Sequence, residues 1–357
     1  MKKIRLGFIG TGGMGQCAHL RNYSTLPNCE LVALAELRPE LAKAVATRYG
    51  IPQVYANDAE LIGHADVDAL VAIQPFTAHG KLLPGIVERG LPMIIEKPLA
   101  RSSEVAVQLA ALAARRATPL YVAYHKRSDP ATMAGVALKR EWQRTGAYGA
   151  LRYIRVTMPP GQWTAEGFST LVRSNEDYPK PIEDALPAGF EGKAAHDHFA
   201  FVNYYIHQIN LLRHLFGEDY AVTFADPAGR ILAARSASGV TGVLEMAPYH
   251  TTVDWQESAL IGFDKGWIRI DLPAPLVIDR SGTLTVFRDN GAPEGPTTSS
   301  PVLPLIHAMR SQAMNFLKAV AGEPNPLCQA GEAAKDIATA DEFLRLQQKS
   351  GGVNLSF

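Results

Sequence analysis

The sequence predicts an α/β protein of two domains, the first built on a parallel sheet and the second an α/β domain with an open, mostly antiparallel sheet. Over the first third of the chain, short apolar runs alternate with helical patterns, which is typical of a parallel sheet covered by helices. Beyond about residue 151 the strand candidates alternate apolar and polar residues, as in a sheet with one solvated face. A length of 357 residues also suits two domains better than one.

The first predicted unit is a strand, a tight turn and a helix. An apolar run at residues 4–9 leads into the pattern G-x-G-x-x-G, in which Gly10 permits the tight turn and Gly12 lets the backbone approach a pyrophosphate. Gly15 lets the following helix lie against the strand, and the N-terminus of that helix offers N–H groups to phosphate. The unit predicts a Rossmann dinucleotide-binding domain, with a phosphate site formed by Gly10, Thr11, Gly12, Gly13, Met14 and Gly15.

A carboxylate stands where a bound ribose would need an acceptor. The second apolar run, residues 31–34, is followed by Glu36, about 20 positions beyond the last glycine of the turn. Glu36 would accept a hydrogen bond from a ribose 2′-hydroxyl and repel a 2′-phosphate, which favours NAD as the cofactor. Arg38 could instead accommodate that phosphate, so NADP stays the alternative.

The remaining elements of the first domain follow in order. Gly90 ends one helical pattern, and Ser102 and Ser103 are candidate N-caps for an alanine-rich helix. The predicted strands are 68–73, 92–95 and 120–123, and the predicted helices are 81–87 and 104–116.

The character of the sequence changes near Tyr124. We therefore expect a dinucleotide-binding domain at 1–124 and a substrate-binding and oligomerisation domain at 125–357. Residues 159–199 lack periodicity and are rich in proline, glycine and aromatic residues, which is typical of a lid, a binding loop or an oligomer contact. Clear strands are expected at 268–272 and 284–286 and helices at 200–215, 308–321 and 330–348, the last of which could pack back on the first domain.

Composition argues against several classes of function. The 35 basic and 35 acidic residues give a formal net charge of zero, which argues against a nucleic-acid or anionic-membrane partner. No window is apolar enough for a membrane span, and glycines interrupt the N-terminal apolar run where a signal peptide would continue. The three cysteines have no metal or redox spacing and fit a reducing compartment, so we expect a cytoplasmic protein. His196, Asp197 and His198 have no further ligand at a recognisable spacing, so no metal site is expected.

Two groups of polar residues are candidates for chemistry. Lys97 directly follows the apolar run 93–95, at the carboxyl end of a predicted parallel strand, which is where open sheets bind ligands. On the predicted helix of the second domain, Asn203, His207 and Asn210 share one face at helical spacing. Cofactor contacts at the sheet edge are expected from Gln74, Pro75, His79, Glu96 and Lys97.

These motifs together resemble the glucose–fructose oxidoreductase / myo-inositol dehydrogenase (Gfo/Idh/MocA) family over nearly the whole chain. The resemblance implies tightly held NAD(P), a sugar, cyclitol or related polyol as the substrate, and a homodimer or homotetramer. It rests on Pro75, His79 and His207, and on the motifs GFIGTGGMG at 7–15, EKPLA at 96–100, YHKR at 124–127 and WQESALIGFDKGWIRIDLP at 255–273.

The resemblance also implies the residues that transfer the proton. Lys97 matches the lysine of the family's EKP motif and His207 matches the histidine of an Asp-x-x-x-His pair, but Asn203 stands in place of the aspartate. Since asparagine cannot accept a proton, we expect His207 to be the general base, Lys97 a cation that favours the developing alkoxide, and Asn203 an orienting group. Gln74 and Phe76 also depart from the threonine and asparagine of the family. The expected substrate-binding residues are Lys97, Arg127, Trp163, Asn203 and His207.

Three functions stay open at this point. The first is an NAD(P)-dependent dehydrogenase or reductase acting on a carbohydrate CH–OH group. The second is a redox-neutral lyase that oxidises a sugar carbon transiently so that a neighbouring bond can be eliminated, an alternative kept because Asn203 replaces the aspartate. The third is a non-catalytic cofactor-binding regulatory protein, against which the joint presence of Lys97 and His207 argues.

Overall fold

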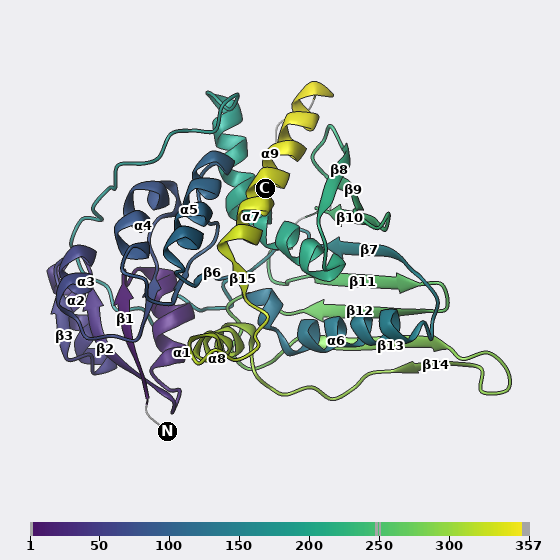
Figure 1. Ribbon diagram of the computed structural model, residues 1–357, viewed down its shortest axis with the longest axis horizontal. Coiled ribbons are helices and arrows are strands. Elements are labelled where there is room, and N and C mark those ends of the chain that lie inside the picture. The colour runs from purple at the N-terminus through teal and green to yellow at the C-terminus, as the bar shows by residue number, and fades with distance from the viewer. Residues whose placement is uncertain (1–2, 247–248, 250, 352–357) are drawn as a thin grey trace. The chain divides into compact units, whose positions relative to one another are not determined.

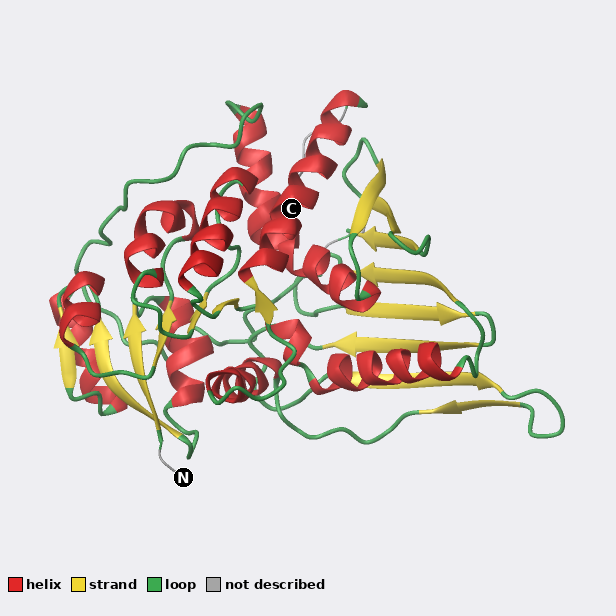
Figure 2. Cartoon of the chain, viewed as in Figure 1, coloured by secondary structure: helices red, strands yellow, loops and turns green. Residues whose placement is uncertain are grey.

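The computed structural model describes residues 3–246, 249 and 251–351, and the chain divides into two compact units that are not continuous in sequence (Figures 1 and 2). The first unit comprises Met1–Tyr124, Glu166–Ala195 and Met309–Ile337. The second comprises His125–Ala165, His196–Ala308 and Ala338–Phe357. Two later segments of the chain therefore belong with the N-terminal unit.

The first unit contains a seven-stranded sheet within the described residues. Its strand order is β15-β6-β5-β4-β1-β2-β3, and β1 to β6 are parallel whereas β15 pairs antiparallel with β6. The order reverses at β1, which lies between β2 and β4, and such a switch point is where doubly wound sheets bind ligands. The strands are β1 (Ile4–Ile9), β2 (Cys29–Ala35), β3 (Gln53–Tyr55), β4 (Ala69–Ala72), β5 (Met93–Ile95), β6 (Leu120–Val122) and β15 (Cys328–Gln329).

The helices of this unit confirm most of the predicted pattern. The turn after the glycine motif is π-helical over Gly15–Leu20 and continues into α1 (Arg21–Tyr23). Ser102 caps α5 by accepting from the N–H of Val105, as expected from the sequence. The other helices are α2 (Pro39–Tyr49), α3 (Asp58–His64), α4 (His79–Val87) and α5 (Ser103–Arg116).

Helix α8 (Ala308–Val320) contributes to the core of the first unit. The ring of Phe316 is fully buried and makes edge-to-face contacts with Tyr23 and Tyr121, at centroid distances of 6.3 and 6.2 Å. Tyr23 in turn contacts Phe8 of β1 at 5.7 Å. These aromatic contacts join α8 to the parallel sheet, although about 200 to 300 residues separate the partners in sequence.

The second unit contains an eight-stranded sheet in the order β14-β13-β12-β11-β7-β10-β9-β8 within the described residues. All its neighbouring strands are antiparallel except β7 and β10, so the expected antiparallel character is confirmed. The strands are β7 (Leu151–Thr157), β8 (Tyr220–Ala225), β9 (Ile231–Ser236), β10 (Thr241–Glu245), β11 (Glu257–Phe263), β12 (Gly266–Leu272), β13 (Thr283–Asp289) and β14 (Pro296–Ser299).

Helix α6 (Pro130–Thr145) covers part of this sheet. A Cβ at Gly135 would lie only 2.8 Å from Cδ1 of Ile270, so the helix approaches β12 closely because it has a glycine there. Helix α7 (Lys193–Phe216) begins seven residues before its predicted start, because its first two turns lack the apolar periodicity that marks the rest. Helix α9 (Ala330–Lys349) contributes its residues up to Ile337 to the first unit and the remainder to the second.

Candidate functional site

The glycine turn has the geometry that its sequence predicts. Gly10 adopts a φ of +84°, and a Cβ there would lie 2.3 Å from the carbonyl oxygen of Ile73. A Cβ at Gly15 would lie 2.7 Å from the carbonyl oxygen of Gly10. A Cβ at Gly12, in contrast, would meet no described atom within 4 Å. The first and last glycines therefore permit close backbone packing, and the middle one leaves space for a ligand.

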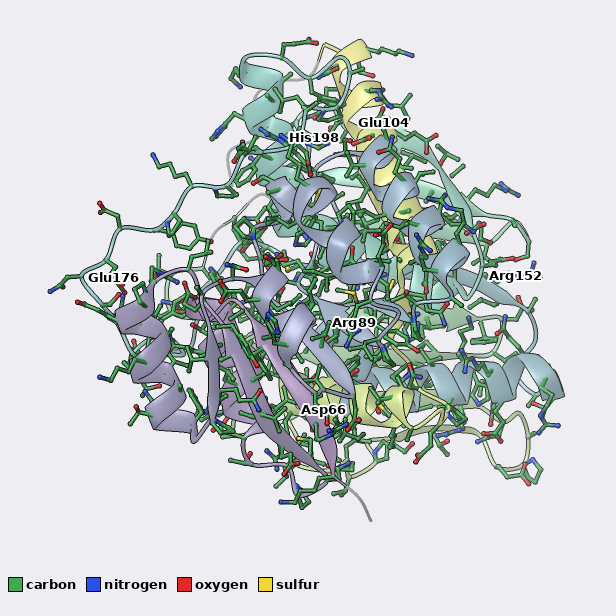
Figure 3. The ribbon with its side chains drawn as sticks, turned by 60° about the vertical axis from the view of Figure 1, so that its left-hand side comes forward. Asp66, Arg89, Glu104, Arg152, Glu176 and His198 are labelled. Atoms are coloured by element: carbon green, nitrogen blue, oxygen red, sulfur yellow. The ribbon has the colours of Figure 1, made fainter. Side chains whose placement is uncertain are left out.

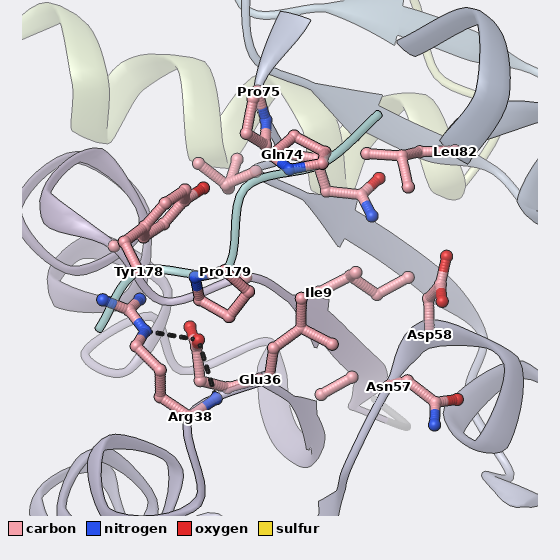
Figure 4. A pocket seen from close by; sticks show the side chains of 16 residues that line it. Ile9, Glu36, Arg38, Asn57, Asp58, Gln74, Pro75, Leu82, Tyr178 and Pro179 are labelled. Carbon is pink, nitrogen blue, oxygen red and sulfur yellow. Dashed lines mark hydrogen bonds and ion pairs between the residues drawn. The ribbon is translucent and has the colours of Figure 1, made fainter. Parts of the chain in front are cut away.

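A cavity of about 710 Å³, its open mouth included, lies at the carboxyl ends of β1, β2 and β4 (Figure 4). Seven of the expected cofactor residues lie outside its lining, namely Thr11, Gly13, Met14, Gly15, His79, Glu96 and Lys97. Those in the lining are Gly10, Gly12, Glu36, Arg38, Gln74 and Pro75.

Glu36 is the acidic group of this cavity and is held in place from two sides. Its Oε2 accepts hydrogen bonds from the N–H of Thr11 at 2.9 Å and from the Thr11 hydroxyl at 3.0 Å. Its Oε1 accepts from Nε of Arg38 at 2.8 Å. Burial alone would raise the pKa of Glu36, but the hydrogen bonds from Arg38 and Thr11 outweigh it and lower the pKa. The cavity thus presents an ionised carboxylate at the end of β2.

His79 connects two loops behind the cavity. The side chain is fully buried, with Nδ1 2.9 Å from the carbonyl oxygen of Leu99 and Nε2 3.2 Å from that of Gln74. Burial lowers the pKa of His79 although both carbonyls oppose that effect. These contacts hold the loop after β4 against the loop after β5.

His19 is a buried partner of the EKP motif that sequence reasoning missed. Its Nε2 lies 2.8 Å from Oε1 of Glu96, and the other carboxylate oxygen accepts from the N–H of Lys97 at 3.1 Å. Burial would raise the pKa of Glu96, but the hydrogen bond and charge of His19, followed by the charge of Lys97, lower it. The Lys97–Pro98 peptide is cis. Glu96 therefore holds the backbone of Lys97 at the end of β5 and contacts the helical turn after the glycines.

In the second unit, His207 lies on α7 and its ring contacts that of His125. The two imidazoles meet edge to face, with centroids 4.9 Å apart and planes at 71°. His125 is buried, His207 is half-buried, and Asn203, one turn earlier on α7, is exposed. The sequence singled out YHKR as a motif but not His125 as a partner of His207.

A buried polar network lies beside this histidine pair. Lys126 forms an ion pair with Glu257 of β11, and both side chains are almost completely buried. Glu257 also accepts from Nε2 of Gln208 at 2.8 Å and from Nε1 of Trp255 at 3.2 Å. Since Gln208 follows His207 on α7, the network fixes this turn of the helix against the sheet.

The other predicted substrate residues also lie in the second unit. Arg127 is buried, and Trp163 is half-buried and accepts from the N–H of Leu276 through its carbonyl oxygen. Lys97 belongs to the first unit and His207 to the second, so their meeting at one substrate stays a prediction.

In the segment His196-Asp197-His198, where the sequence predicts no metal site, His198 contacts a buried aspartate. Nε2 of His198 lies 2.7 Å from Oδ1 of Asp341 on α9, with both side chains buried. Among residues 3–246, 249 and 251–351, no group of three His, Cys, Asp or Glu side chains could hold a metal ion. No helix in the same described residues is long and apolar enough to cross a membrane.

The strand order, the glycine turn and the ionised Glu36 define the first unit as a dinucleotide-binding Rossmann domain. Residues 4–124 match the model of the GFO_IDH_MocA oxidoreductase family, which is described as an NAD-binding Rossmann fold. This match lies within the dinucleotide-binding domain and spans about a third of the chain.

Individual relatives agree with this assignment. The chain is 33% identical over 150 residues to an inositol 2-dehydrogenase of Acidothermus cellulolyticus, and the match spans 42% of each chain. The chain thus covers well under half the length of this curated relative.

Two solved structures have a similar fold. One is a putative NADPH-dependent oxidoreductase of Desulfitobacterium hafniense, with a TM-score of 0.74, 13% identity, and 98% and 96% of the two chains covered. The other is levoglucosan dehydrogenase in complex with NADH and levoglucosan, with a TM-score of 0.71, 19% identity and both chains fully covered.

Proposed function

We propose that this protein is an NAD-dependent oxidoreductase that transfers a hydride between nicotinamide and a CH–OH group of a sugar, cyclitol or related polyol. The observation that carries the proposal is the glycine-lined cavity at the switch point of the parallel sheet, with ionised Glu36 in its wall. Lys97 follows β5 at the same carboxyl edge.

The residues present fit a dinucleotide. Gly12 leaves open space for the pyrophosphate, and Glu36 offers an ionised acceptor for a ribose hydroxyl. The charge of Glu36 would repel a 2′-phosphate, and Nε of Arg38 is already bonded to this carboxylate. These contacts favour NAD over NADP.

The chain's own contribution to the reaction is a base and a cation. A lysine that acted as a neutral base near pH 7 would need its pKa lowered by roughly three units from about 10.4, which costs on the order of 4 kcal/mol. An imidazole with an unperturbed pKa near 6.5 needs almost no shift. We therefore assign proton removal from the substrate hydroxyl to His207, stabilisation of the alkoxide oxygen to Lys97, and orientation to Asn203. The nicotinamide, when bound, supplies the hydride chemistry.

The relatives support the substrate class. The relatives include inositol 2-dehydrogenases and a levoglucosan dehydrogenase, which are named for a cyclitol and a sugar derivative. In the second unit, the ring of Trp163 suits stacking on sugar C–H faces, and Arg127 is a hydrogen-bond donor for hydroxyl groups.

The test is a spectrophotometric screen for NADH formation with NAD and a panel of cyclitols, sugars and polyols. Lys97→Ala and His207→Ala are each expected to abolish turnover while NADH binding persists. Lys43→Ala and His64→Ala, at exposed positions of α2 and α3, are the matched controls and should retain activity. NADH binding without turnover across the whole panel would contradict the proposal.

The redox-neutral lyase is the second candidate, because Asn203 removes a carboxylate from the expected base pair. In such a reaction the hydride returns to the substrate after a neighbouring bond is eliminated. Product analysis by mass spectrometry would then find substrate cleavage without net NADH formation, an outcome that favours the lyase over the dehydrogenase.

We also propose that the protein is a homodimer or homotetramer and that it is located in the cytoplasm. In β11 and β12 one face is buried, whereas the other face is mostly half-exposed, and there the ring of Trp267 stacks on that of Phe287 of β13. Such a face suits a second copy of the chain. Cys17, Cys29 and Cys328 are buried and outside disulfides, which fits a reducing compartment. Light scattering after size exclusion measures the subunit number, and a monomer would contradict the oligomer.

A further inference from the structure

The long segment between β7 and α7 forms part of the wall of the cavity. We name residues 168–184 the strap. The strap belongs to the first unit and, over these described residues, contains neither helix nor strand. Sequence reasoning left it open as a lid, a binding loop or an oligomer contact. Three of its attachments to the parallel-sheet unit bear on the choice among these alternatives.

The first attachment is to the glycine turn. The side-chain amide of Gln16 donates from Nε2 to the carbonyl oxygen of Val172 at 3.0 Å, and its Oε1 accepts from the N–H of Val172 at 2.8 Å. Nearby, the ring of Phe168 lies where a Cβ on Gly13 would approach it to 3.2 Å. The start of the strap therefore covers the turn that is expected to hold the pyrophosphate.

The second attachment caps α2. The carboxylate of Glu176 accepts hydrogen bonds from the N–H groups of Glu40 and Leu41, at 3.1 and 3.0 Å (Figure 3). The N-cap residue of this helix, Arg38, makes no side-chain capping bond of its own. The strap thus supplies the charge-assisted cap that α2 lacks locally.

The third attachment is at the start of α4. The buried carboxylate of Asp184 accepts a hydrogen bond from the N–H of Gly80 at 2.7 Å. The backbone N–H of Asp184 donates to the carbonyl oxygen of Thr77 at 2.7 Å. A Cβ at Gly80 would lie 2.8 Å from Oδ1 of Asp184, so the carboxylate can approach because this residue is glycine.

Between the second and third attachments, the strap forms one wall of the cavity. Tyr178, Pro179 and Pro181 line it from the strap, and Figure 4 shows Tyr178 and Pro179 beside Arg38 and Glu36. The guanidinium of Arg38 lies over the Tyr178 ring, 5.0 Å from its centroid. The strap wall therefore meets the end of β2, where the adenosine ribose is expected.

We infer that the strap is a clasp for the adenosine half of the dinucleotide, with Tyr178 and Pro179 as cofactor-contacting residues and Glu176 and Asp184 as the positioning residues that keep it closed. This inference rests on the proposed NAD site.

Since the clasp spans the cavity between two fixed carboxylates, the dinucleotide enters and leaves when one attachment opens. Loosening an attachment therefore speeds both association and dissociation, whereas the loss of a simple contact would speed dissociation alone.

The test is stopped-flow fluorescence of NADH binding and release by the full-length protein. Glu176→Gln and Asp184→Asn are expected to speed both association and dissociation of NADH by roughly five- to thirtyfold, the factor expected when a helix cap is weakened. Glu191→Gln, at an exposed position beyond the strap, is the matched control and should leave both rates unchanged. Rates for both attachment variants equal to those of the control would overturn the clasp.

Two further measurements keep the result independent of folding and of the dehydrogenase activity. Tyr178→Ala leaves all three attachments intact and should weaken NADH binding at least fivefold. Trypsin cleavage after the exposed Arg173 should be slowed by saturating NADH in the wild type and faster in Glu176→Gln. No protection by NADH would count against the clasp. If the attachment variants release NADH faster but the protein oxidises no polyol, the dehydrogenase proposal alone is refuted. If the protein oxidises a polyol but the attachment variants release NADH at the wild-type rate, the clasp alone is refuted.

Discussion

Replacement of His19 by alanine tests the role of the buried pair behind Lys97. Leaving a buried polar group without its hydrogen-bond partner costs about 1–3 kcal/mol, and more when the group is charged. Glu96 is a buried carboxylate, but the N–H of Lys97 still donates to it, so we expect a loss of about 3 kcal/mol. His19→Gln keeps an N–H donor and should recover at least half of the loss.

The stability lost in His19→Ala should depend on pH. The pKa of Glu96 is lowered in the folded protein from its ordinary value of 4.5, so its stabilising contribution is present above about pH 4.5 and lost as the pH falls through the folded pKa. In His19→Ala the buried carboxylate lacks its main partner and takes up a proton more readily. The stability deficit of this variant should therefore be larger at pH 7 than at pH 5.

The assay is urea unfolding at both pH values, followed by circular dichroism, with His64→Ala as the control for an exposed histidine in the same unit. The double variant His19→Ala/Glu96→Ala should be less destabilised than the sum of its single variants, because it has no unpaired carboxylate. Strict additivity, or a deficit equal to that of His64→Ala, would refute the reasoning.

Three other predictions concern the cofactor, the histidine pair and the core. Glu36→Gln should raise the Kd for NADH about tenfold and lower that for NADPH, because Arg38 is released; an unchanged ratio in fluorescence titrations would contradict the assigned role. His125→Phe should lower kcat about tenfold, because a phenyl ring keeps the edge-to-face contact with His207 but can neither donate nor accept a hydrogen bond; an unchanged kcat would argue for packing alone. Phe316→Ala should cost about 3–5 kcal/mol in urea unfolding, and a loss below 1 kcal/mol would remove α8 from the stabilising core.

Local signals in the sequence were sufficient for much of the fold. The glycine turn, the strand at 93–95 and the Ser102 cap each depend on neighbouring residues, and the structure has all three. Helix α6 was missed although Asp129 and Pro130 form a standard N-terminal signal, so a local sign existed there. Strands β8 to β10 also lacked a prediction.

Other features depend on contacts between distant residues, which periodicity does not encode. Glu96 and His19 are 77 positions apart, and the two-residue strand β15 is defined by its pairing with β6. The strap shows the same limit, since Gln16 and Val172 are 156 positions apart. Sequence composition marked the strap as irregular, but only the pairing of each carboxylate with a helix N-terminus reveals what it does.

The discontinuous make-up of the first unit also bears on how the protein is made. Its glycine turn is synthesised well before Glu176, Asp184 and Phe316. Until those residues are made, α2 lacks its cap and the aromatic surface around Tyr23 and Tyr121 stays uncovered. The nucleotide-binding unit is therefore complete only after α8 has been synthesised, and its partly folded form exposes apolar surface in the meantime.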